Sequence, residues 1–187
     1  MTDLNSRYGM NPPHSEVVDA CHHIEPRNVL DMGCSNGRNA LYLSQLGFNV
    51  TAVDHNAGAI QSLQSIVAQE NITNIDPRIY DINQARLDAD YGLIICTVTL
   101  MFLAPDRVET VLADMQESTL PGGYNLIVCA MNTAAHPCPV HFLFTMKERQ
   151  LDAFYHGWEM IKYNEDLGTM HNGAQLQFAT MLARKPV

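Results

Sequence analysis

The fold of this chain is decided by one stretch, Val29-Leu30-Asp31-Met32-Gly33-Cys34-Ser35-Asn36-Gly37-Arg38-Asn39. It consists of an apolar strand, an acidic residue, two glycines and the start of a helix. In α/β proteins such a turn lies at the carboxyl end of the first strand and forms one wall of a nucleotide pocket. The stretch therefore predicts an α/β fold with a small-molecule site at this turn.

Strand-like and helix-like segments alternate around this stretch, which predicts a mostly parallel sheet with helices on both faces. We expect strands over residues 28–32, 48–54, 77–80, 91–97, 124–130, 158–164 and 176–184. We expect helices over residues 16–24, 38–45, 56–70, 106–117 and 147–154. The last two strands, joined by a polar loop at 165–174, should form an antiparallel hairpin. We predict a flexible or draping arm over residues 1–14, a turn at 121–123 and a loop at 132–144.

Length and composition exclude several classes of protein. The 187 residues fit a single domain over 1–187, and a hydrophobic content of 47% fits a packed core. A net charge of −9 disfavours a nucleic-acid partner. No apolar run could cross a bilayer or act as a signal peptide, so we expect a cytoplasmic protein without membrane contact. The five cysteines are irregularly spaced and form no CxxC pair, which predicts free thiols and no metal.

The distance in sequence between the glycine turn and an acidic residue limits which class of ligand the site can bind. Asp54 ends the second predicted strand about 20 residues after Gly33, where an acid accepts hydrogen bonds from ribose hydroxyls. The competing interpretation is a tight turn with Asp54 as a helix cap. Ser35 stands where a dinucleotide turn needs a glycine for close approach of a pyrophosphate. The turn therefore favours an adenosyl ligand without phosphates, such as S-adenosylmethionine, over NAD.

Several blocks of the chain resemble a known family. Residues 30–39 resemble motif one of the class I S-adenosylmethionine-dependent methyltransferases. Six blocks over nearly the whole chain resemble the tellurite-resistance methyltransferase (TehB) family: His14-Ser15-Glu16-Val17, Asn36-Gly37-Arg38-Asn39, Thr97-Val98-Thr99-Leu100-Met101-Phe102-Leu103, Pro121-Gly122-Gly123-Tyr124-Asn125-Leu126-Ile127-Val128, Lys162-Tyr163-Asn164-Glu165-Asp166 and Phe178-Ala179-Thr180-Met181-Leu182-Ala183-Arg184-Lys185. The resemblance implies the Rossmann-like sheet of seven strands of that class, mostly parallel with a C-terminal antiparallel hairpin.

The resemblance also implies which residues bind the cofactor, S-adenosylmethionine, which methyl transfer converts to S-adenosylhomocysteine. The methionine end should be held by residues of the arm and the glycine turn, namely Arg7, Tyr8, His14, Asp31, Gly33, Cys34, Ser35, Arg38 and Asn39. Asp54 should bind the ribose and His55 should lie beside the adenosine. Asp81 and Ile82 should hold the adenine edge, and Thr97 and Val98 should lie beneath the sulfonium.

The methyl acceptor should be a small soft nucleophile, a tellurite- or selenite-type oxyanion or a thiol, which needs no general base. We expect it over Val98–Phe102, with Met101 and Phe102 in its pocket, beneath the loops 132–144 and 165–174. His171 could orient an oxyanion or discharge a proton; the competing interpretation is a solvent-exposed loop histidine. Two positions depart from the family pattern, because Asn172 and Gln177 stand where the family carries arginines.

Other interpretations remain open. A protein that binds S-adenosylmethionine without catalysis is one alternative, and a nicotinamide-dependent oxidoreductase on the same fold is another. His136, Cys138 and His141 could suggest a metal, but the intervening prolines distort their spacing, so we expect a plain loop. No coiled-coil or swapped element is evident, and we expect a monomer or a weak homodimer.

Overall fold

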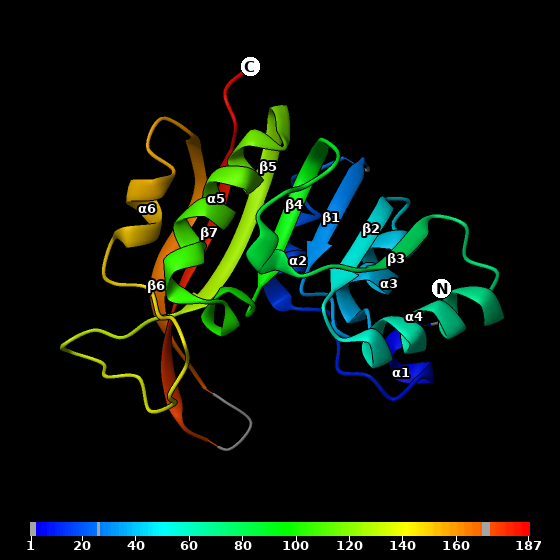
Figure 1. Ribbon diagram of the computed structural model, residues 1–187, viewed down its shortest axis with the longest axis horizontal. Coiled ribbons are helices and arrows are strands. Elements are labelled where there is room, and N and C mark those ends of the chain that lie inside the picture. The colour runs from blue at the N-terminus through cyan, green and yellow to red at the C-terminus, as the bar shows by residue number, and fades with distance from the viewer. Residues whose placement is uncertain (1–2, 26, 170–172) are drawn as a thin grey trace.

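In a computed structural model, which describes residues 3–25, 27–169 and 173–187, the chain forms one seven-stranded sheet flanked by helices (Figure 1). The strands are β1 (Asn28–Met32), β2 (Asn49–Asp54), β3 (Ile75–Ile79), β4 (Tyr91–Thr97), β5 (Thr119–Ala130), β6 (Glu159–Thr169) and β7 (Gln175–Arg184). The α-helices are α1 (Leu4–Arg7), α2 (Ser15–Ala20), α3 (Arg38–Gln45), α4 (Ala57–Gln69), α5 (Val108–Glu117) and α6 (Gln150–Phe154). None of the described helices has the length and apolar character of a membrane span.

The order of the strands creates a crevice at the centre of the sheet. The sheet runs β3-β2-β1-β4-β5-β7-β6, and β1 to β5 run parallel to one another, whereas β7 is antiparallel to β5. The chain builds outward from β1 to β3 and then returns to place β4 on the other side of β1. Ligands of open α/β sheets bind at such a reversal, beyond the carboxyl ends of the strands. The predicted fold class is confirmed, including the antiparallel hairpin of β6 and β7.

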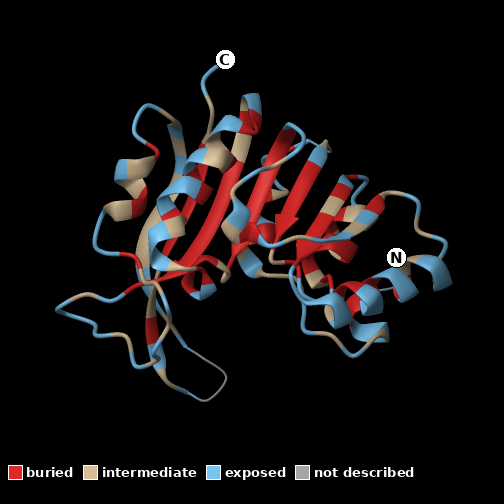
Figure 2. Cartoon of the chain, in the orientation of Figure 1, coloured by how far each residue is buried: buried red, intermediate tan, exposed pale blue. Residues whose placement is uncertain are grey.

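Alternation along the central strands explains why helices cover both faces. Successive side chains of a strand point to opposite faces. In β4, Leu93 and Ile95 pack into a core that includes residues of α2, α3 and α4. Ile94 and Cys96 pack into a second core with residues of α5 and α6. The buried central strands lie between these two layers, as Figure 2 shows in red.

The structure corrects several expected boundaries. The residues 121–123, expected as a turn, lie within β5 as an irregularity: Gly122 has φ +70°, and the pairing with β4 shifts between Tyr91 and Leu93. The polar segment 165–169, expected as a loop, continues β6. This part of β6 lies at the edge of the sheet, where side chains reach solvent, so polar residues there do not indicate a loop. Helix α2 ends at Ala20 instead of residue 24, and α6 begins at Gln150 instead of residue 147.

The predicted N-terminal arm packs along the glycine-turn helix. Helix α1 buries Leu4 and Asn5, and Asn5 Nδ2 donates to the carbonyl of Arg38 at 2.9 Å. Arg7 Nη1 contacts Glu70 Oε2 at 2.9 Å, and the Tyr8 hydroxyl donates to the same carboxylate. These contacts tie the arm to both ends of the α3–α4 layer, and the segment that follows runs along the carboxyl edge of the sheet.

A chain of buried hydrogen bonds joins β5 to its covering helices. The hydroxyl of Tyr155, just after α6, donates to Asn125 Oδ1 at 2.7 Å. Asn125 Nδ2 donates to Thr119 Oγ1 at 2.7 Å, and that hydroxyl donates to the carbonyl of Met115 in α5 at 2.6 Å. All four residues of this hydrogen-bond series are buried, so their polar groups cannot bond to water and are satisfied by one another instead.

We predict that Tyr155→Phe lowers the free energy of unfolding by about 1–3 kcal/mol, because Asn125 Oδ1 loses its partner inside the core. Urea unfolding measures the change. Tyr42→Phe is the matched control, since the Tyr42 hydroxyl has no hydrogen bond to the described residues. An equal loss in both variants would contradict the interpretation.

Candidate functional site

The turn after β1 is built from three residues in the left-handed backbone region. Gly33, Ser35 and Gly37 have φ angles of +76°, +50° and +92°. A Cβ on Gly33 would lie 2.3 Å from Thr99 Oγ1, and one on Gly37 would lie 2.5 Å from a methyl of Leu63. Both glycines are therefore required by space as well as by backbone conformation. The turn can fold tightly against β4 on one side and α4 on the other.

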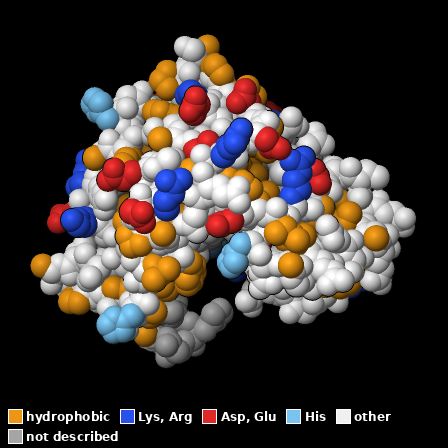
Figure 3. All heavy atoms as spheres, in the orientation of Figure 1, with side chains coloured by type: hydrophobic (Ala, Val, Ile, Leu, Met, Phe, Trp, Pro, Cys, Tyr) orange, Lys and Arg blue, Asp and Glu red, His pale blue; other side chains and the backbone are white. Residues whose placement is uncertain are grey.

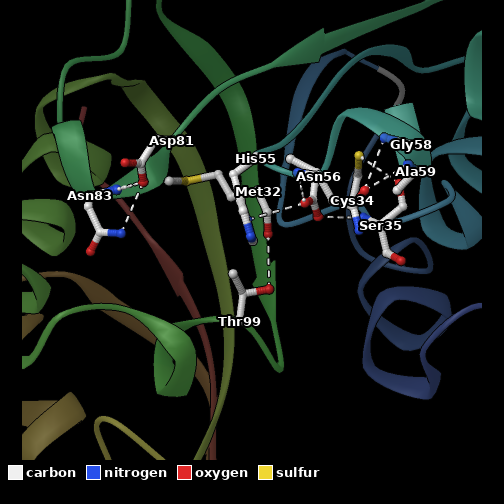
Figure 4. Close-up of polar contacts among 11 residues, drawn as sticks. Met32, Cys34, Ser35, His55, Asn56, Gly58, Ala59, Asp81, Asn83 and Thr99 are labelled. Atoms are coloured by element: carbon white, nitrogen blue, oxygen red, sulfur yellow. Dashed lines mark hydrogen bonds and ion pairs between the residues drawn. The ribbon is translucent and has the colours of Figure 1, made fainter. Parts of the chain in front are cut away.

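Asp54 holds this turn in place from the end of β2. Its Oδ2 accepts a hydrogen bond from the Ser35 backbone N–H at 2.9 Å, and its Oδ1 accepts one from the Asn56 N–H, also at 2.9 Å (Figure 4). The left-handed conformation costs a non-glycine residue about 1–2 kcal/mol, which the first of these bonds offsets at Ser35. Asn56, and not Asp54, caps α4, by accepting from the N–H groups of Gly58 and Ala59. Each Asp54 oxygen keeps a lone pair for a further donor.

Two cavities of 440 and 420 Å³ lie on either side of the turn, and they share Gly33, Ser35 and Val98. The first is lined by Gly9, Met10, Asn11, Gly33, Cys34, Ser35, Asn36, Arg38, Asn39, Thr97 and Val98. The second is lined by Gly33, Ser35, Asp54, His55, Asp81, Ile82, Asn83, Val98, Thr99, Phe102 and Leu103. We call the two together the turn cavities. Figure 3 shows a notch that opens at the lower margin of the molecule, with hydrophobic side chains and a histidine beside it.

Most of the predicted site residues line the turn cavities, but five of the described ones do not. His14 lines a different cavity, and Arg7 and Tyr8 are both engaged with Glu70. Asp31 is buried behind the turn. Met101, predicted for the substrate pocket, is 0% exposed and packs in the core, whereas Phe102 is 58% exposed. The prediction for Met101 is wrong because neighbouring side chains of the short 3₁₀ turn Leu100–Phe102 lie about a third of a turn apart, so Met101 faces the core while Phe102 faces outward. His171 and Asn172 lie outside the described residues.

The sequence did not single out several residues that line these cavities. Residues 9–11 of the arm carry no motif that would have placed them there. Asn83 follows the predicted pair Asp81 and Ile82 directly, which was a signal available in the sequence. Its N–H and Nδ2 both donate to Asp81 Oδ1 at 3.0 Å, and its Oδ1 accepts from the N–H of Ala104 (Figure 4). Asn83 therefore fixes the loop that forms the outer wall.

Asp31 has one oxygen engaged and one without a partner. Its carboxylate accepts a hydrogen bond from the N–H of Ala40, in the first turn of α3, where Gly37 offers no side-chain cap. Oδ2 is buried and has no hydrogen-bond partner in the described part of the chain. Burial raises the pKa of Asp31 from 3.8 to about 7, and the nearby Asp54 also raises it, whereas Arg38 and the Ala40 N–H lower it. A cationic donor at Oδ2 would favour the ionised form.

Asn39 links three elements around the first cavity. Its Oδ1 accepts from the backbone N–H of His14 at 2.9 Å, and its Nδ2 donates to Thr97 Oγ1 at 3.2 Å. The arm, α3 and the end of β4 are thereby joined through one amide that is 5% exposed. Arg38, on the neighbouring position, keeps its guanidinium at the cavity, with one contact to the carbonyl of Pro12 at 3.5 Å.

Two further side chains lie beside the turn, the thiol of Cys34 and the imidazole of His55. Cys34 lines the first cavity but is 4% exposed, and burial raises the pKa of its thiol far above the usual value, with Asp31 and Asp54 adding to the effect. Its Sγ donates to the carbonyl of Ser35. His55 is largely exposed, with Nδ1 3.5 Å from Asp54 Oδ1. Within the described residues no three His, Cys, Asp or Glu side chains converge as around a metal ion.

Comparisons with known proteins agree with this geometry. The family profile described as "Tellurite resistance protein TehB" matches residues 3–182. The chain belongs to the TehB family. It is 46% identical over 188 residues to a probable S-adenosyl-L-methionine-dependent methyltransferase TehB of Haemophilus influenzae, covering 97% of this chain and 65% of that protein. It is 45% identical over 189 residues to a protein named Hemagglutinin 1 of Eikenella corrodens, covering 98% of this chain and 63% of that one.

Solved structures place this TehB-family chain in the class I methyltransferase fold. The crystal structure of TehB from Haemophilus influenzae superposes with a TM-score of 0.93 at 45% identity, over 97% of this chain and 65% of that one. An S-adenosylmethionine-dependent methyltransferase structure from Methanosarcina mazei gives a TM-score of 0.75 at 13% identity, over 95% of this chain and 100% of that one. The chain thus spans a little under two thirds of the length of the TehB relatives that it matches.

We predict that Gly33→Ala lowers the free energy of unfolding by about 2–4 kcal/mol, because the methyl group meets Thr99 in a left-handed backbone. Chemical denaturation measures the loss. Gly157→Ala is the matched control: Gly157 has φ +88°, but no atom lies within 4 Å of the place that a Cβ would take, so it should lose only the backbone share. Equal losses would show that contact with Thr99 does not matter.

We further predict that the free energy of unfolding of the Asp31→Asn variant rises relative to that of the parent protein as pH rises from 4 to 7.5. Since burial favours the protonated acid, Asp31 contributes stability that is fully present below about pH 4 and is lost as pH rises through 7. Asparagine stays neutral throughout. Urea unfolding across this range should show a change on the order of a few kcal/mol. Asp90→Asn, at an exposed position, should leave the profile unaltered.

Proposed function

We propose that this chain transfers a methyl group from S-adenosylmethionine to a small soft nucleophile, with tellurite- or selenite-type oxyanions as first candidates and a thiol as the next. The observation that carries the proposal is the pair of cavities that meet at Gly33, Ser35 and Val98. Family membership and the methyltransferase fold support the same interpretation.

The polar groups of the first cavity fit the amino-acid end of S-adenosylmethionine. Arg38 offers a guanidinium to a carboxylate, and the unpartnered Oδ2 of Asp31 lies behind the same turn as an acceptor for an ammonium group. A pyrophosphate would bring no cation to Asp31, so these groups favour a zwitterionic ligand.

The second cavity fits the adenosine end. Asp54 retains lone pairs for ribose hydroxyls, and Asp81 and Ile82 line the wall where an adenine edge would lie. Phe102 and Leu103 supply apolar surface beside it. Residues fitting both ends of the donor thus lie on the two sides of one turn, which supports binding of a single extended ligand.

S-adenosylmethionine would supply a methyl group on a sulfonium; a nucleophile in line with the C–S bond takes the methyl carbon, and S-adenosylhomocysteine is the leaving group. The task left to the chain is to align donor and acceptor and to exclude water. Val98 stands where the two cavities meet, and its N–H is held by the carbonyl of Val128 at 2.7 Å. Its φ of +57° is strained for a β-branched residue, and strain of this kind persists where the surroundings fix it. Val98 is therefore our candidate for the residue beneath the transferred methyl group, and His171 remains our candidate for orienting the acceptor.

A second candidate function is binding of S-adenosylmethionine without turnover, and one observation favours it. Gln177, which replaces a family arginine, is neutral and has both ends of its amide engaged. Its Nε2 donates to the carbonyl of Glu165 at 2.8 Å, and its Oε1 accepts from Thr133 Oγ1 at 2.9 Å. This side chain fastens the 132–144 loop to the hairpin and offers no charge to an anion.

Binding and turnover can be measured separately to test the proposal. Isothermal titration should detect binding of S-adenosylmethionine and not of NADH. Asp54→Asn should weaken binding about tenfold or more, because a charged acceptor is lost, while Asp90→Asn should leave it unchanged. Release of S-adenosylhomocysteine with selenite, tellurite or 2-mercaptoethanol then separates enzyme from binder. Absence of S-adenosylmethionine binding would overturn both candidate functions.

A further inference from the structure

A third cavity, of 350 Å³, shares Val98 with the turn cavities. The start of α2 forms one wall with His14 and Glu16, and the β6–β7 hairpin forms the opposite wall with Asn164, Phe178 and Thr180. We call this space the hairpin cavity. No described residue other than Val98 lines both this cavity and the turn cavities. A group passing between them would cross at Val98.

A hydrogen bond selects one tautomer of the neutral His14 ring at this cavity. As the N-cap of α2, its Nδ1 accepts a hydrogen bond from the Glu16 N–H at 3.2 Å. The residue is also held through its backbone N–H, which donates to Asn39 Oδ1. Since Nδ1 is an acceptor, a neutral ring carries its proton on Nε2. Nε2 makes no hydrogen bond with the described part of the chain, so its N–H is left for a ligand.

The surroundings keep the imidazole neutral. Burial lowers the pKa of His14, the charge of Arg38 lowers it further, and Glu16 acts in the opposite direction. Glu16 itself is paired with Lys162, whose Nζ lies 2.6 Å from Glu16 Oε2 and 3.0 Å from Asp19 Oδ2. His14 is therefore a hydrogen-bond donor at neutral pH and not a charged group.

We propose that the hairpin cavity holds the methyl acceptor and that His14 Nε2–H donates a hydrogen bond to an oxygen of that acceptor, a chalcogen oxyanion. This inference rests on the proposed methyl transfer and deepens it, because it names the acceptor's pocket and a residue that positions it. It assigns His14 to the acceptor and not to the methionine carboxylate. Thr180, 6% exposed, lies on the hairpin wall of the same pocket.

Two substitutions separate the helix cap from the proposed donor. His14→Asn keeps an acceptor near the place of Nδ1 but has no group at the place of Nε2. His14→Gln keeps an N–H donor near the place of Nε2 but loses the cap. The matched control is His23→Asn, at an exposed histidine just after α2.

The probes are S-adenosylmethionine, and selenite added to the protein saturated with S-adenosylhomocysteine, both followed by isothermal titration. For His14→Asn we expect about 10- to 100-fold weaker selenite binding and a similarly raised selenite KM, with S-adenosylmethionine affinity unchanged. For His14→Gln we expect selenite binding largely retained, while loss of the cap lowers Tm by about 3–6 °C. His23→Asn should match the parent protein throughout.

The outcomes distinguish this inference from the proposed function. If the parent protein fails to bind S-adenosylmethionine, the proposed function fails. If it binds S-adenosylmethionine but its S-adenosylhomocysteine complex does not bind selenite, or if His14→Asn binds selenite normally, the inference about His14 fails alone. Weakened S-adenosylmethionine binding in His14→Asn would show that His14 contacts the cofactor, and it would also overturn the inference.

Discussion

The space for one methyl group at Gly33 governs the arrangement around it. Thr99, at the start of the segment after β4, occupies the place that a Cβ on Gly33 would take. The turn after β1 and the segment after β4 therefore lie in contact, and Val98 is brought to the junction of three cavities. The left-handed residues that permit this contact also direct the Ser35 N–H to Asp54. The turn and the junction of the three cavities depend on this one close approach.

Three aspartates at the carboxyl edge show how one residue type serves three purposes. Asp31 is buried, accepts from the first turn of α3 and keeps a free oxygen. Asp54 is held by two backbone N–H groups and still borders the second cavity. Asp81 is exposed and anchors Asn83. The three carboxylates thus share one edge of the sheet but differ in burial and in the backbone or side-chain groups that they hold.

Short-range patterns predicted the fold and part of the site, and long-range contacts explain what they missed. The buried strands and the glycine turn were readable because apolar alternation and missing side chains leave local signals. The pairing of Tyr8 with Glu70 joins residues distant in sequence, so no local signal announces it. Met101 and Phe102 are both apolar, and only the geometry of their 3₁₀ turn separates core from cavity. The end of β6 was predicted as a loop because its side chains are polar, as those of an edge strand that faces water can be.

Cys34 lies at the wall of the cavity proposed for a methyl donor, where a thiolate would be a competing nucleophile. Burial and two neighbouring carboxylates keep this sulfur protonated, and its S–H is directed to the carbonyl of Ser35. A neutral thiol is a poor nucleophile toward a sulfonium. If the turn binds a cationic methyl donor as proposed, the same carboxylates that suit it to that donor would also protect Cys34 from methylation.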